Sequence, residues 1–325
     1  MLALPGVGKL ARHLPRWRGV LTLNYHRVGD SAGQPWDRTL WSTNADTLDA
    51  QLGVLARHAE VVTPEEVPRL VRDNRPGRRV LLTFDDGYRD NFKVAFPLLR
   101  KHGLCATFFL ASGFLDHPRA AWWDELAWMV RRATRTKMSA GEWLPGSLAL
   151  GPEQDATIAT IVAHYKTLPS DDTERYLEYV ASATGAGRCD RTASADLWMT
   201  WEMARELRSA GMQIGGHTVT HPILARVPQA QQEEEIAGCK LRLQEELGQE
   251  MDWFAYPVGA QDTFTDDTRR ILRDHGVQLA FSFYGGFGHF TEWDSLDVPR
   301  VHVGPDHGPE LLQAMVWLPR LFARW

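Results

Sequence analysis

The chain has 325 residues, of which 44% are hydrophobic and 24% charged, a globular composition that excludes a disordered, collagen-like or coiled-coil chain. A formal net charge of −5 at pH 7 provides no global positive field and argues against a nucleic acid partner. No apolar run approaches the roughly 18 residues that cross a bilayer, and no secretory signal is recognised after the basic N-terminus. Three distant cysteines, Cys105, Cys189 and Cys239, form no CxxC pair and are expected to be free thiols. These features predict a cytoplasmic protein.

Short apolar runs alternate with amphipathic stretches along most of the chain. Before residue 115, the patterns predict strands over 19–25, 80–84 and 106–110 and helices over 45–58 and 89–101. After residue 200, they predict strands over 212–215, 253–256, 278–281 and 298–303. The helices predicted between these later strands and before the first of them lie over 200–210, 229–247 and 265–275. About seven strand-plus-helix units favour a closed or nearly closed parallel α/β barrel over an open sheet. The glutamates at 233–235 are interpreted as the solvated first turn of their helix.

The segment 115–198 interrupts this alternation, because it has helical patterns and almost no strand signal. Its helices are predicted over 122–132, 155–168 and 173–183. We interpret the segment as an α-helical insertion between two barrel strands. The expected organisation is therefore a barrel over 19–114 and 199–308, an insertion over 115–198, and terminal helical segments over 1–18 and 309–325.

The first chemical signal is a pair of carboxylates, Asp85 and Asp86, that directly follows the apolar strand 80–84. In a parallel barrel, side chains at the C-terminal end of a strand face the active-site mouth. Adjacent carboxylates there repel each other unless a cation or a proton intervenes. A metal ion on one of them leaves the other free to act as a base, whereas the alternative is a helix cap followed by a loop aspartate.

The second signal is a histidine pair, His217 and His221, that follows the strand 212–215. Two imidazoles four residues apart can converge on one ion, and imidazole with carboxylate is a ligand set typical of zinc. An isolated HxxxH pair also occurs by chance on surfaces. Together with Asp86 at another strand end, it predicts a three-ligand site with open coordination positions.

These motifs resemble those of a known family. The segments 83–87 (TFDDG) and 217–221 (HTVTH) are similar to the first two motifs of the polysaccharide deacetylase family, also called NodB-homology or carbohydrate esterase family 4, and 253–259 resembles the third. The resemblance implies a distorted (β/α)7 barrel. It also implies that Asp85 is the general base and that Asp86, His217 and His221 bind a divalent metal.

The chemistry of these residues agrees with that assignment. A metal ion can polarise an acetamide carbonyl while Asp85 takes a proton from the attacking water. Zinc is the first choice, and nickel, cobalt or manganese fit two histidines and one carboxylate almost as well. We expect metal-dependent hydrolysis of N-acetyl groups from an amino-sugar-containing glycan or its lipid-linked precursor, with release of acetate.

Two positions depart from the commonest family pattern. Ala255 stands near the place where many members have an arginine that orients the base, and Arg300 is the candidate substitute. The acid histidine of the last motif has no clear counterpart. Tyr25-His26 resembles the Tyr-His motif of a subset similar to the poly-N-acetylglucosamine deacetylases, so His26 is the expected acid. His302 and His307 are the alternatives.

Other residues are expected around the reaction. By analogy with the family, a backbone N–H near Tyr88 completes the oxyanion site, and Tyr256, Pro257 and Gly259 shape the groove wall. Five tryptophans either pack the insertion onto the barrel or offer flat faces to sugar rings, with packing the favoured use: Trp122, Trp123, Trp128, Trp198 and Trp201.

The two ends of the chain carry apolar stripes beside basic residues. Such a terminus either docks onto the barrel, which is the favoured interpretation, or makes peripheral contact with the inner membrane face. The sequence predicts no oligomeric state.

Two rival functions keep the same residues. A metal-dependent amidase or esterase would hydrolyse a small molecule instead of N-acetylhexosamine polymers. A glycan-binding module with a relic site would bind carbohydrate without turnover, an idea motivated by the missing arginine. The intact set of Asp85, Asp86, His217 and His221 argues against such decay.

Overall fold

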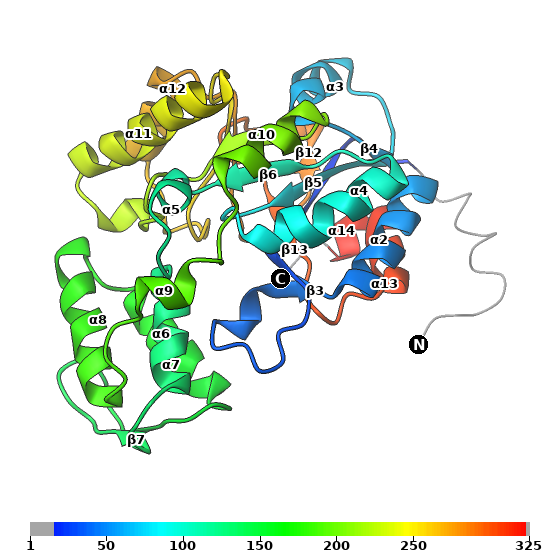
Figure 1. Ribbon diagram of the computed structural model, residues 1–325. Coiled ribbons are helices and arrows are strands. Elements are labelled where there is room, and N and C mark those ends of the chain that lie inside the picture. The colour runs from blue at the N-terminus through cyan, green and yellow to red at the C-terminus, as the bar shows by residue number, and fades with distance from the viewer. Residues whose placement is uncertain (1–15, 323–325) are drawn as a thin grey trace.

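The computed structural model describes residues 16–322, and Figure 1 shows their arrangement. Most of the terminal segment expected over 1–18, and the last residues of the segment expected over 309–325, lie outside the described residues. A helix, α13 (Pro309–Trp317), occupies the expected C-terminal region and packs against α2 (Ala45–His58). Within the described part of the chain, no helix combines the length and apolarity that a membrane crossing requires.

Seven parallel strands form the centre of the molecule. They are β1 (Gly19–Tyr25), β5 (Arg79–Phe84), β6 (Thr107–Leu110), β9 (Gln213–Gly216), β10 (Trp253–Ala255), β11 (Leu279–Phe281) and β13 (Arg300–His302). Their order is β11-β10-β9-β6-β5-β1, with β13 on the other side of β1. A parallel bridge between Phe281 and Val298 brings β11 beside the segment that enters β13, so the sheet curls toward closure. The predicted distorted (β/α)7 barrel is confirmed.

Two short strands extend this sheet beyond the prediction. One is β4 (Glu60–Val61), which pairs with β5, and the other is β12 (Gly288–His289), which runs antiparallel to β1. Each has two residues, too few to produce a period-two pattern in the sequence.

Alternation along each strand separates two hydrophobic layers. On β1, Val20 belongs to a cluster with Leu81, Phe109 and Phe281, which come from different strands and fill the barrel. Its neighbour Leu21 belongs to the cluster between strands and helices. Successive side chains of a strand point to opposite faces, and this period places the polar residues at the strand ends either in the barrel mouth or against a helix.

Helices cover the outer face of the barrel (Figure 1). Besides α2 and α13 they are α3 (Val67–Asp73), α4 (Phe96–His102), α5 (Ser112–Asp116), α10 (Trp201–Ser209), α11 (Gln229–Leu247), α12 (Asp266–Asp274) and α14 (Pro319–Phe322). The helix predicted over 89–101 begins instead with a π-helical turn over Asn91–Ala95 and continues as α4. Asn44 begins α2 by accepting a hydrogen bond from the backbone of Thr47.

The part of the chain that connects β6 to β9 contains a group of helices on one side of the barrel (Figure 1). Its members are α6 (Trp122–Arg131), α7 (Asp155–Tyr165), α8 (Ser170–Thr184) and α9 (Arg191–Ser194). Almost no strand was expected in the segment 115–198, but the structure has one small antiparallel pair there, β7 (Lys137–Met138) with β8 (Leu148–Ala149). These helices bury a hydrophobic cluster of their own, which reaches the barrel side through Trp41 and Tyr88.

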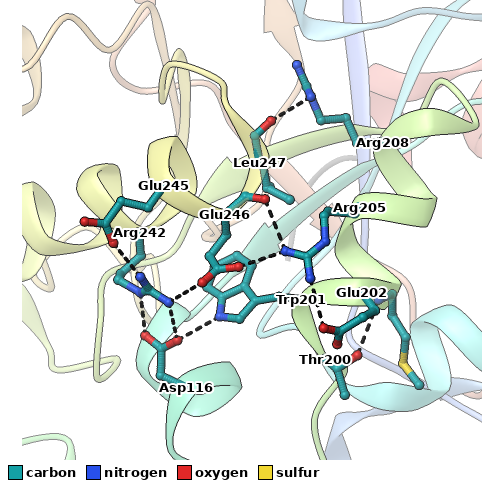
Figure 2. A network of polar contacts seen from close by, with 11 residues as sticks. Asp116, Thr200, Trp201, Glu202, Arg205, Arg208, Arg242, Glu245, Glu246 and Leu247 are labelled. Atoms are coloured by element: carbon teal, nitrogen blue, oxygen red, sulfur yellow. Dashed lines mark hydrogen bonds and ion pairs between the residues drawn. The ribbon is translucent and has the colours of Figure 1, made fainter.

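A polar network joins both connections of this helical segment to α11 (Figure 2). The carboxylate of Asp116, at the end of α5, accepts a hydrogen bond from Trp201 Nε1 at 2.8 Å. Arg242 of α11 donates to both oxygens of the same carboxylate at 2.8 Å. Since Asp116 precedes α6 and Trp201 follows α9, one carboxylate ties both ends of this group of helices to the barrel.

We expect Asp116→Asn to lower the free energy of unfolding by about 1–2 kcal/mol. Charge-assisted hydrogen bonds in a partly buried network are stronger than ion pairs that are exposed to solvent. Urea unfolding measures the change. The control Asp267→Asn breaks an exposed pair with Arg270 and should cost less than about 0.5 kcal/mol. Equal effects of the two variants would contradict the anchoring role of Asp116.

Candidate active site

Three side chains from two strand ends converge on one point in the barrel mouth. Asp86 follows β5, and His217 and His221 follow β9. One ligand atom of each lies within 4.8 Å of the other two, and all three residues are buried. Asp86 Oδ1 is 3.4 Å from His217 Nε2 and 3.5 Å from His221 Nε2. Ligand atoms about 2.1 Å from a tetrahedral ion are about 3.4 Å apart, so the spacing fits a zinc-type ion.

Different surroundings leave a ring nitrogen of each imidazole available to a cation. His217 Nδ1 lies 2.7 Å from the Ala255 carbonyl oxygen, which only accepts, so Nδ1 carries the proton and Nε2 faces Asp86. Such a partner on the far nitrogen orients a ligating histidine. Burial, with a contribution from His217, lowers the pKa of His221 to about 3. A neutral His221 has a free lone pair for a cation.

The backbone of the histidine loop is held from outside the barrel. Glu235 on α11 accepts hydrogen bonds from the backbone N–H groups of Val219 and Thr220, both at 2.8 Å. The prediction that residues 233–235 form the solvated first turn of their helix is wrong, because α11 begins at Gln229 and these residues lie in its second turn, where Glu235 is buried. Two residues along a helix point to nearly opposite sides, so Glu235 faces the barrel while Glu233 is exposed. This spacing was the signal available in the sequence.

Backbone strain gathers at this site. Positive φ angles occur at Asp86 (72°), Thr218 (66°), His221 (59°) and Val258 (63°). Residues with a Cβ rarely adopt such angles, and each costs roughly 1–3 kcal/mol. Strain of this kind persists where surrounding contacts over-determine it, as the bonds from Glu235 to the histidine loop do.

Asp85 lies beside the triad in a different environment. Its Oδ1 accepts a hydrogen bond from Arg300 Nη1 at 2.7 Å, and its Oδ2 accepts one from Asn24 Nδ2 at 3.0 Å. Burial by itself raises the pKa of Asp85, but the charge of Arg300 and its hydrogen bond outweigh this effect and hold the pKa well below its usual range. Asp85 is therefore ionised at neutral pH, with both oxygens fixed in direction.

Arg300 contacts Asp85, as the expected substitute for the arginine that orients the base should. It is fully buried, and besides Asp85 it donates to the carbonyl of Ser282 at 2.9 Å and to Asn24 Oδ1 at 3.0 Å. The sequence interpretation missed Asn24, which joins the arginine to the aspartate. Its position two residues before His26, on the strand face that leads into the mouth, was the available signal.

The three candidate acids are placed unequally. His26 Nε2 lies 3.9 Å from Asp85 Oδ2, and burial lowers the pKa of His26 although Asp86 and Asp85 oppose the change. His302 lines the same pocket, and burial lowers its pKa to about 4. His307 is not among the lining residues, and its Nδ1 accepts a hydrogen bond from the backbone of Gly304 at 3.0 Å.

The catalytic groups open into a pocket of 270 Å³. The helical segment supplies part of its wall, with Trp122, Trp123, Val162 and Lys166 among the lining residues. A second pocket of 520 Å³ shares Trp122 and His221 with the first. The segment predicted as an insertion therefore contributes to the site as well as to packing.

Of the five tryptophans, Trp122 and Trp123 line the pocket. The others lie in packing contacts, with Trp198 and Trp201 buried and Trp128 partly buried. The Trp123 ring lies edge-on to His221 with centroids 4.4 Å apart.

The remaining predicted wall residues lie less directly at the site. Tyr256 lines the pocket, but its hydroxyl donates to the Leu296 carbonyl in the core at 2.7 Å. Val258 lines the pocket instead of Pro257 and Gly259.

Tyr88 is outside the pocket lining, and the structure gives its side chain a supporting position. Its hydroxyl donates to Asp124 at 2.7 Å and accepts from Trp123 Nε1 at 2.7 Å. Tyr88 thus holds the indole that lies against His221. The oxyanion role of a backbone N–H near this residue stays a prediction.

The chain is similar to known proteins in sequence and in fold. Residues 72–137 and 169–280 match the family model described as polysaccharide deacetylase. YxkH of Bacillus subtilis (strain 168) is 42% identical over 60 residues, which are 18% of this chain and 22% of that relative, so the alignment spans less than a quarter of YxkH.

Two solved structures share the fold. The Streptococcus pyogenes deacetylase PplD in complex with acetate has a TM-score of 0.61 at 21% identity, covering 92% of this chain and 98% of that chain. IcaB from Ammonifex degensii has a TM-score of 0.57 at 22% identity, covering 93% and 98%.

Proposed function

Because the chain belongs to the polysaccharide deacetylase family, we propose that it removes N-acetyl groups from an amino-sugar-containing glycan, or from its lipid-linked precursor, and releases acetate. The observation that carries this proposal is the buried group of Asp86, His217 and His221 with Asp85 beside it in one pocket. A triad that could hold a cation, next to a carboxylate outside it, offers the Lewis acid and the general base that metal-assisted hydrolysis of an amide uses.

The donor set supports a divalent metal at the triad. One carboxylate and two neutral imidazoles suit zinc, and they also suit nickel, cobalt or manganese. Burial by itself raises the pKa of Asp86, but His217 and His221 hold it below its ordinary value, so the carboxylate is available as a ligand. When bound, such an ion supplies a Lewis acid for the amide carbonyl.

In the proposed reaction, water adds to the amide carbon, the C–N bond breaks, and the products are acetate and a free amine. Asp85 takes a proton from the water. Arg300 and Asn24 hold the Asp85 carboxylate by one oxygen each, so its orientation is set before substrate arrives. Arg300 is a positioning residue, taking the place of the arginine absent at Ala255.

His26 is our proposed acid, which delivers a proton to the leaving nitrogen. Its ring is in the same pocket as Asp85 and His217, and it follows β1 directly. A histidine in this place, preceded by Tyr25, supports assignment to the subset with a Tyr-His motif.

We expect His26→Ala to lower kcat by at least about 100-fold, since loss of a general acid removes proton delivery in the transition state. Metal content should stay at the wild-type level, because His26 is outside the triad. Acetate release and elemental analysis measure the two quantities. An unchanged rate would transfer the acid role to His302 or His307, and His302→Ala in the same assay separates these.

The test of the function itself is acetate release from a panel of N-acetylated glycans, with and without a chelator. Acetate from an N-acetylhexosamine oligomer that is lost on chelation supports the proposal. Hydrolysis of small amides or esters, with no acetate from any glycan, would contradict it.

A further inference from the structure

One lysine of the helical segment reaches the active-site pocket. Lys166 follows the last turn of α7, is half-buried, and lines the 270 Å³ pocket together with Asp85 and His217. Among the described residues, no other lysine or arginine lines this pocket. Burial lowers the pKa of Lys166, and Asp37 opposes that change only in part. Burial of this extent disfavours the charged form of the side chain unless a partner compensates it.

Each acidic residue of the pocket has another partner for at least one carboxylate oxygen, although Asp37 also attracts Lys166. Asp85 pairs with Arg300, and Asp86 faces the two histidines of the triad. Asp37 Oδ1 accepts hydrogen bonds from the backbone N–H of Thr39 at 3.0 Å and from its hydroxyl at 2.7 Å. Within residues 16–322, Lys166 forms no ion pair with a carboxylate.

Withdrawing an ammonium group from water costs free energy unless an anion or several acceptors compensate it. Attraction to the C-terminal end of α7 is available to a lysine that points into solvent, so it does not explain why Lys166 faces the pocket. A ligand that brings a negative charge would supply the missing partner.

We propose that Lys166 is an anion-recognition residue, and that the substrate carries a phosphate or carboxylate close to the N-acetyl group that is removed. This inference rests on the proposed function, since it describes the glycan that enters the same pocket. Both anions present oxygen acceptors to an ammonium group, and they differ in source: a phosphate belongs to a phosphorylated or lipid-linked sugar, and a carboxylate to an acidic sugar.

The experiment measures binding of three probes by isothermal titration calorimetry: N-acetylglucosamine, N-acetylglucosamine 1-phosphate and N-acetylmuramic acid. Wild-type protein should bind at least one anionic probe about tenfold more tightly than the neutral sugar, the scale of one charge-assisted contact. In Lys166→Met this ratio should fall to about one, and Lys166→Arg should restore most of it. Comparison of the two anionic probes identifies the phosphate or the carboxylate.

Lys137→Met is the matched control, because Lys137 is an exposed lysine of the same helical segment and does not line the pocket. It should keep the wild-type ratio. A wild-type protein without preference for an anionic probe would overturn the proposal, as would an equal loss of neutral and anionic binding in Lys166→Met. Lys166-dependent anion binding without acetate release from any glycan would support the role of Lys166 while contradicting the proposed function.

Discussion

Asp85→Asn should reduce acetate release by up to about 10⁴-fold, the upper range for loss of a general base. Asparagine keeps the shape of the side chain, but it cannot take a proton from water at neutral pH. The metal ligands are untouched, so bound metal should remain at the wild-type stoichiometry. A coupled acetate assay and elemental analysis test both halves of the expectation, and activity like that of the wild type would remove Asp85 from the mechanism.

Arg300→Met is the matched variant, because it keeps the base and removes the charge beside it. Without the guanidinium, burial dominates and the pKa of Asp85 rises. Asp85 is then protonated at a higher pH, so the acidic limb of the kcat/KM profile should move upward relative to the wild type. An unshifted limb would contradict electrostatic positioning by Arg300, even if the overall rate falls.

Removal of His217, a proposed metal ligand, is expected to have an effect of similar size. His217→Ala should reduce bound metal below the wild-type stoichiometry and lower acetate release by at least about 10³-fold, since a bound ion contributes several kcal/mol of transition-state stabilisation. Treatment of the wild type with a chelator should produce the same loss, and added zinc should restore activity only to the chelated wild type.

His117→Ala provides the control for this prediction. His117 is exposed and does not line either pocket that contains His221. It should retain metal and activity. Full activity of thoroughly chelated wild-type protein would show that the triad does not act through a cation.

The sequence predicted the barrel and the triad through local patterns. The strand over 19–25 and the helices over 45–58 and 229–247 have the bounds of β1, α2 and α11, because long periodic segments carry strong signals. Asp86 and His217 were found because residues that follow parallel strands share one mouth of the barrel.

The contacts that surround the triad were harder to predict, because they join segments far apart in the chain. Asn24 and Arg300 meet at 3.0 Å across 276 positions of sequence, and no local pattern reports such a pair. In the sequence, Glu235 is one of three consecutive glutamates of a helix. In the structure, it accepts a hydrogen bond from the backbone of the histidine loop. Pro257 and Gly259 were expected in the wall, but Val258 between them lines the pocket instead.

By itself, the sequence determined the fold class and the side chains that form the triad, since strand periodicity and short motifs are properties of neighbouring residues. Only the tertiary structure decided how Asp85 is charged and oriented, and that Lys166 enters the pocket. Both depend on burial and on partners from distant elements, and these exist only once the barrel has closed and the helical segment has packed against it.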